Sequence, residues 1–70
     1  MLRLYAKMSG KKRFYAVDMV HGVIVANLID ASIFPDEALP ELRKSAESLN
    51  PGVLFQIRDG HNKVLQEYRG

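Results

Sequence analysis

Basic and aromatic side chains alternate near the start of the chain. The first seventeen residues carry five cations and no carboxylate, and the rest of the chain carries five cations and eight carboxylates. Cations that hold phosphates, beside aromatic rings that stack on bases, are typical of single-stranded nucleic-acid binding. The candidate residues for contact with a nucleic acid or a protein partner are Arg3, Tyr5, Lys7, Lys11, Lys12, Arg13 and Tyr15. The alternative is a solvated turn, with Phe14 in the core.

Residues that could support catalysis or bind a metal are sparse. The chain has no cysteine and two histidines, His21 and His61. A zinc ion needs three or four protein ligands, and each histidine has one neighbouring aspartate, Asp18 or Asp59. No serine lies in a nucleophile motif, and the five glycines are scattered singly, so no phosphate-binding loop is present. We therefore predict that the protein is not an enzyme, and that it has no catalytic residue, metal site, cofactor or small-molecule substrate.

The size and composition indicate one folded domain. The chain has 70 residues, of which 47% are hydrophobic and 26% are charged, as in ordinary globular proteins. Its longest apolar run, residues 23–26, is far shorter than a membrane span, which needs about 20 residues. The N-terminal residues lack the pattern of a signal peptide. We expect a single domain over residues 1–70, a cytoplasmic location and no membrane contact.

The first 26 residues predict three strands. Apolar residues at positions 2, 4, 6 and 8 alternate with Arg3, Tyr5 and Lys7, which is typical of a half-buried strand. A turn over residues 9–12, with Gly10 at a positive φ, leads to a second strand over residues 13–19. Gly22 marks the turn before a third strand, residues 23–26, and residues 27–32 hold a further turn. Because the third strand is apolar at every position, we expect it in the centre of the sheet or beneath a helix.

One helix is predicted between Asp36 and Leu49. Its apolar stripe has spacings of three and four residues and consists of Ala38, Leu39, Leu42, Ala46 and Leu49. Pro35 favours an extended Phe34 just before it. Pro40 leaves two possible starts, because proline is tolerated only in the first helical turn. We favour a start near Asp36 over a start at Pro40, and residues 50–52, Asn-Pro-Gly, end the helix.

The last part of the chain predicts a hairpin. Residues 53–58 and 63–68 have strand character, and the turn between them, residues 59–62, has the sequence Asp-Gly-His-Asn. The fold class is therefore α+β. We predict a small antiparallel sheet in the order β-β-β-α-β-β, with one helix packed on one face.

Apolar residues on both faces of the predicted sheet indicate a contact surface. Leu54 and Leu65 fall opposite the main apolar set of the last hairpin, Val53, Phe55, Ile57 and Val64. In the second strand, Tyr15, Val17 and Met19 oppose Phe14 and Ala16. If the helix covers one face, Leu54, Leu65, Tyr15, Val17 and Met19 form an apolar patch on the other. Such a patch and the free sheet edges predict a protein partner or a homodimer.

Residues 2–68 resemble small uncharacterised proteins encoded by bacteriophages and other bacterial mobile elements. The resemblance is one of pattern and lies in Arg-Phe-Tyr-Ala-Val-Asp at 13–18, Asp-Ala-Ser-Ile-Phe at 30–34 and Leu-Asn-Pro-Gly-Val-Leu-Phe-Gln-Ile at 49–57. It carries over no functional residues. It implies a protein that binds and inhibits a host enzyme or defence complex, as anti-CRISPR proteins do. Our leading prediction is a non-enzymatic binding protein that blocks or regulates a protein partner. The alternative is nucleic-acid binding through the basic, aromatic N-terminal hairpin.

Overall fold

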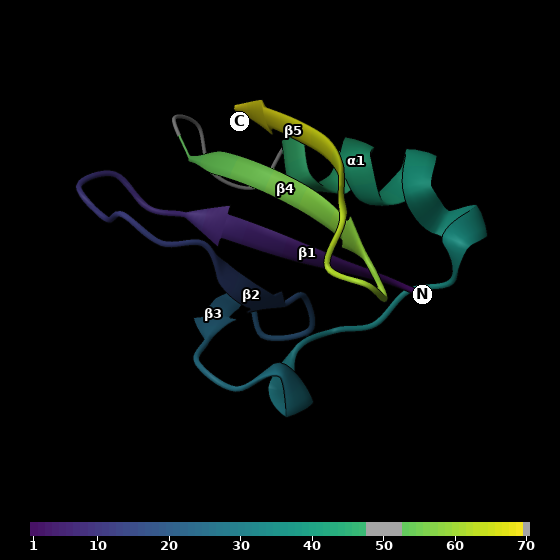
Figure 1. The fold of residues 1–70 in the computed structure, drawn as a ribbon, viewed down its shortest axis with the longest axis horizontal. Coiled ribbons are helices and arrows are strands. Elements are labelled where there is room, and N and C mark those ends of the chain that lie inside the picture. Colours follow the sequence, from purple (N-terminus) through teal and green to yellow (C-terminus); the bar gives the residue numbers. More distant parts are fainter. Residues whose placement is uncertain (48–52, 70) are drawn as a thin grey trace.

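Five antiparallel strands and one short α-helix make up the fold. The computed structural model describes residues 1–47 and 53–69. The sheet has the spatial order β3-β2-β1-β4-β5, with β3 and β5 at its two edges (Figure 1). The elements are β1 (Leu2–Lys7), β2 (Tyr15–Asp18), β3 (Val23–Val25), α1 (Leu39–Glu47), β4 (Leu54–Asp59) and β5 (Val64–Arg69). The predicted fold class and the order of elements along the chain are confirmed.

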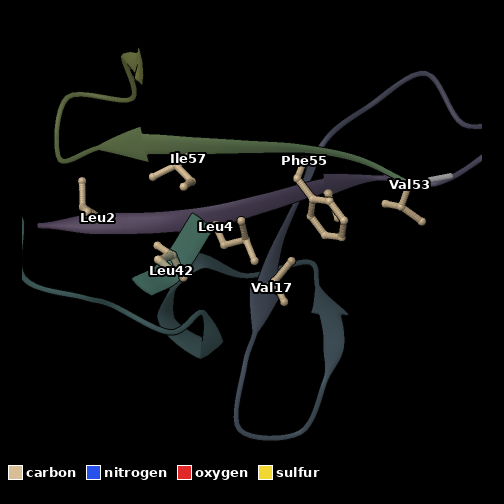
Figure 2. Close-up of a cluster of buried hydrophobic side chains, with 8 residues drawn as sticks. Leu2, Leu4, Val17, Leu42, Val53, Phe55 and Ile57 are labelled. Atoms are coloured by element: carbon tan, nitrogen blue, oxygen red, sulfur yellow. The ribbon is translucent and has the colours of Figure 1, made fainter. Parts of the chain in front are cut away.

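The main core lies between the sheet and α1. Because side chains alternate along a strand, β1 directs Leu2, Leu4 and Ala6 to one side. Figure 2 shows this cluster, in which Leu42 of α1 packs over the sheet. We call it the helix-side core, and its buried members are Leu2, Leu4, Ala6, Val17, Leu42, Val53, Phe55 and Ile57. Leu4 and Ile57 are fully buried, and the burial of each such side chain stabilises the fold by about 1.5–3 kcal/mol.

The third strand differs from the expectation. It lies at the edge of the sheet, where it pairs only with β2, and Val23 and Ile24 are 50% and 43% exposed. The prediction of a central or helix-covered strand is therefore wrong. The strand is only three residues long, and the chain leaves it directly for a 3-10 turn over Leu28–Asp30. Short edge strands limit the exposed pairing surface, so an apolar sequence can occupy an edge here.

The start of the helix combines both predicted alternatives. A 3-10 turn over Asp36–Ala38 begins where the favoured prediction placed the helix, and it leads directly into α1 at Leu39. Pro40 lies in the first turn of α1, where its missing N–H leaves no hydrogen bond unmade. In a continuous α-helix its ring would meet the carbonyl of Asp36, and the tighter turn removes that conflict. The predicted stop at residues 50–52, and Leu49 of the predicted stripe, lie outside the described residues.

The predicted apolar patch opposite the helix is wrong in part. Val17 is buried in the helix-side core, and Met19 packs against it. Tyr15 pairs with Ala6 in the sheet, so it lies on the helix side as well. In β5 the alternation is interrupted by a register shift after the Ile57–Gln66 pair, so that Arg58 pairs with Val64 instead of Leu65. A bulge of this kind cannot be read from alternation, because one extra residue reassigns the faces beyond it.

The connections hold the strands in place. Phe34 is extended, as Pro35 requires, and its backbone exchanges hydrogen bonds of 2.7 and 2.9 Å with Leu2 beside β1. The predicted β4–β5 turn is confirmed, since Asn62 N–H donates to the Asp59 carbonyl at 3.0 Å. The Asp59 carboxylate accepts hydrogen bonds from the backbone N–H groups of Lys63 and His61, which lowers its pKa below the ordinary 3.8.

Two turn glycines offer a matched test of backbone strain. Gly22 has a φ of +67°, whereas Gly60 does not adopt a positive φ, and a Cβ on Gly60 would meet only Met1 Cε at 3.5 Å. We expect Gly22→Ala to cost about 1 kcal/mol, because only glycine adopts this conformation readily. Gly60→Ala should be neutral or stabilising by about 0.5 kcal/mol, through the unfolded state. Urea unfolding of both variants checks this, and equal effects would contradict it.

Candidate binding face

The side of the sheet away from α1 carries most of the polar side chains of the central strands. We call it the second face. On β1 it consists of Arg3, Tyr5 and Lys7, which alternate with the core residues. Cross-strand partners share a face, so the register adds Leu54, Gln56 and Arg58 from β4 and Glu67 and Arg69 from β5. On these three strands four side chains are cations and one is a carboxylate, and β2 adds the carboxylate of Asp18, so the second face is basic.

A second, smaller apolar cluster lies beneath this face. Tyr5, Ala16 and Ala31 are buried there, and Phe14 and Val25 pack against them. Ala31 comes from the segment between β3 and the helix, which therefore covers part of the second face. The N–H of the neighbouring Ser32 donates to the carbonyl of Val17 at 3.1 Å, which ties this segment to β2.

The guanidinium group of Arg58 lies over the aromatic residues of this cluster. Its guanidinium carbon is 4.1 Å from the ring centre of Tyr5 and 5.5 Å from that of Phe14. Lys7 Nζ lies 5.8 Å from the Phe14 ring centre. A guanidinium over an aromatic face is attracted by the ring quadrupole and keeps its edge free for hydrogen bonds.

Hydrogen bonds that Arg58 donates to neighbouring side chains fix its orientation. Its Nε and Nη2 donate to Gln56 Oε1 at 2.9 and 2.7 Å, and its Nη1 donates to Asn62 Oδ1 at 3.0 Å. The buried Gln56 is held in turn, because its Nε2 donates to Glu67 Oε1 at 2.7 Å. A guanidinium has five N–H groups, so two of them are not used by these bonds. Arg58 is thus a preorganised cation with donors left for a partner.

The seven residues predicted from the sequence do not form one site. Arg3, Tyr5 and Lys7 lie on the second face. Lys11, Lys12 and Arg13 are exposed in the loop that joins β1 to β2, and Tyr15 lies on the helix side of the sheet. Tyr5 is only 7% exposed and lies beneath Arg58, so its ring offers no surface to a base.

Arg58 and Gln56 are not among the binding residues predicted from the sequence. The alternation of Gln56 and Arg58 with Phe55 and Ile57 places them on the polar side of their strand. In the sheet they share this face with Tyr5 and Arg3, their partners on β1. Gln56 and Arg58 were overlooked because they are far in the sequence from the basic N-terminal stretch. Strand pairing, and not local spacing, brings the two segments together.

The histidines have simple surroundings. His21 Nδ1 lies 2.6 Å from Asp18 Oδ2, and the imidazole is largely exposed. This hydrogen bond, with those from the backbone N–H groups of His21 and Val20, lowers the pKa of Asp18. Among residues 1–47 and 53–69, no three histidine, aspartate or glutamate side chains gather as they would around a metal ion.

The protein is therefore a small α+β domain in which one face of the sheet is basic and has the aromatic rings of Tyr5 and Phe14 beneath Arg58. Comparison of the chain with protein-family models, with curated protein sequences and with solved structures finds no match. In the part of the chain that the structure describes, no helix has both the length and the apolar character of a membrane span.

Proposed function

We propose that the protein is a non-enzymatic binding protein that blocks or regulates a protein partner through its second face. The observation that carries this proposal is Arg58, fixed over Tyr5 and Phe14 by hydrogen bonds to Gln56 and Asn62. Arginine is enriched among the few residues that contribute most of the binding energy of protein interfaces. A side chain that is already ordered loses little conformational entropy when a partner binds, which raises affinity.

Charge and shape indicate the kind of partner. The second face carries Arg3, Lys7, Arg58 and Arg69, and it is bordered by Leu28 and Val64, which are 48% and 43% exposed. Exposed apolar side chains beside cations suit a partner surface that combines carboxylates with apolar groups. That the partner is a host protein, which this chain inhibits, is the part of the proposal that rests on the resemblance to small phage proteins.

The second candidate function is nucleic-acid binding. It is favoured by the exposed loop with Lys11, Lys12 and Arg13, which could contact phosphates. The second face supports it less, because Tyr5 is covered and Tyr15 lies on the other side of the sheet. A platform for stacked bases needs exposed rings on one surface.

Self-association belongs to the same proposal. Strand β5 is six residues long and is the outer strand on its side of the sheet, so its outward N–H and C=O groups can pair with a second copy. We propose a homodimer through this edge. Sedimentation equilibrium should show the dimer mass at micromolar concentration, and a monomer over the whole range would contradict it.

Two matched charge reversals separate the two candidate functions. Lys7 is on the second face and Lys12 is in the exposed loop. In a pull-down from nuclease-treated bacterial lysate, we expect the wild-type protein to capture a stoichiometric protein partner. The Lys7→Glu variant should no longer capture this partner, whereas the Lys12→Glu variant should still capture it. Loss of the bound partner on nuclease treatment would favour nucleic-acid binding. The same holds for a partner that the Lys12→Glu variant releases and the Lys7→Glu variant retains. Circular dichroism checks that both variants remain folded.

A further inference from the structure

A hollow lies on the second face at the start of β1. It has a volume of about 370 Å³, opens to solvent and is lined by Arg3, Tyr5, Leu28, Arg58, Gly60 and Asn62. Four elements meet there, because β1 and β4 supply the arginines and the tyrosine, the β4–β5 turn supplies Gly60 and Asn62, and the 3-10 turn supplies Leu28. It is large enough for one side chain of a partner.

Two guanidinium groups line this hollow without a carboxylate between them. Arg3 and Arg58 are direct cross-strand partners in the β1–β4 pair. Like charges directly opposite in a sheet repel each other and destabilise it. A negative charge bound between Arg3 and Arg58 would reduce this repulsion. Neither Arg3 nor Arg58 forms an ion pair with a carboxylate of the described residues.

Arg3 also has an unsatisfied donor. Its Nε is buried and has no hydrogen-bond partner in the described part of the chain. A buried N–H without a partner is unfavourable, and more so in a charged group, so a negatively charged partner atom that accepts from Arg3 is favoured. The neighbouring carboxylate of Asp59 does not serve, because Asp59 pairs with Leu2 and therefore lies on the helix side of the sheet.

We propose that this hollow binds one glutamate or aspartate carboxylate of the protein partner. The inference rests on the proposed protein-binding function and names the chemistry of the partner. A carboxylate can accept from Arg3 and from the free N–H groups of Arg58 at once, which is the geometry that guanidinium groups favour. Leu28 gives the hollow an apolar wall against which the methylene groups of the acidic side chain pack.

The hollow suits a single carboxylate better than a nucleic-acid strand. Two adjacent cations neutralise one or two negative charges, whereas a strand presents a phosphate at every nucleotide and binds through a longer row of cations. The aromatic ring at the hollow, Tyr5, is covered by Arg58 and is not available to a base. An oligonucleotide is therefore the alternative ligand that the experiment includes.

A peptide titration of the full chain tests this inference. The probe is a capped tetraglutamate peptide, with a capped tetraglutamine peptide as its uncharged counterpart, followed by ¹H–¹⁵N NMR. We expect saturable shifts at Arg3, at the Arg58 Nε–H and at Asn62 with the first peptide only. Arg3→Gln should weaken binding at least about fivefold, because charge-assisted hydrogen bonds are lost. Lys12→Gln removes the same charge outside the hollow and should change the affinity less than about twofold, as expected for a screened surface charge.

Each other outcome overturns the inference. Equal shifts with tetraglutamine, or unchanged affinity in Arg3→Gln, would show that the hollow does not recognise a carboxylate. Shifts at Arg3 and Arg58 with a short oligothymidylate but not with tetraglutamate would assign the hollow to phosphate. If tetraglutamate fails while Lys7→Glu still releases the protein partner, the carboxylate hollow is wrong and the proposed function stands. Arg3→Gln carries the test because Arg58 also supports the fold.

Discussion

Replacing Leu4 with alanine is expected to destabilise the protein by about 3 kcal/mol, because the change leaves a cavity in a fully packed core. Leu4 is completely buried between the sheet and α1, next to Leu42 (Figure 2). A domain of this size has only about 3–5 kcal/mol of net stability. The variant should therefore have a measurable unfolded population at 25 °C, and its urea midpoint should fall to near zero.

Leu65→Ala is the matched control for this prediction. It removes the same atoms from a side chain that is 41% exposed on the edge strand. We expect a loss of no more than about 1 kcal/mol, because much of that side chain is already in water. Circular dichroism during urea unfolding gives both values. Similar losses for the two variants would mean that the helix-side core does not dominate stability.

Tyr5→Ala should destabilise the protein by about 3 kcal/mol, although the sequence predicts Tyr5 as a binding residue. The ring is buried with Ala16 and Ala31, and Arg58 lies 4.1 Å above its centre. Its removal opens the smaller core and also leaves Arg58 without the aromatic face that supports it, an interaction of about 1 kcal/mol. We therefore assign Tyr5 a structural role that positions Arg58.

Tyr15→Ala distinguishes this role from a general effect of losing a tyrosine. Tyr15 lies on the neighbouring strand, on the other side of the sheet, and is half-buried. Its loss should cost about 1–2 kcal/mol, in proportion to the apolar area it buries. Thermal unfolding of the two variants measures the difference. If Tyr5→Ala keeps the wild-type midpoint and only weakens partner binding, Tyr5 is a contact residue and the structural assignment is wrong.

Local sequence patterns determined the elements of this fold. Alternation at positions 2, 4 and 6 predicted β1 and its core side, and the spacing that includes Leu39 and Leu42 predicted the helix. Gly10 and Gly22 adopt the positive φ that their turns require. These predictions succeed because hydrogen bonding and side-chain alternation within a strand or helix depend on neighbours in the chain.

The tertiary structure alone decided which of these elements meet. The apolar third strand lies at the edge because pairing, and not hydrophobicity, sets the strand order. Val17 is a core residue on the helix side, although the sequence analysis assigned it to the opposite patch, because the pairing of β2 with β1 sets which of its faces meets the helix.

The candidate site shows the same division. The sequence pointed to the basic residues of the N-terminal hairpin, and Arg3 and Lys7 do lie on the second face. Arg58 joins them from fifty-five positions beyond Arg3, through the β1–β4 pairing. Spacing along the chain cannot reveal such a pair, because the register between distant strands depends on the packing of the whole sheet.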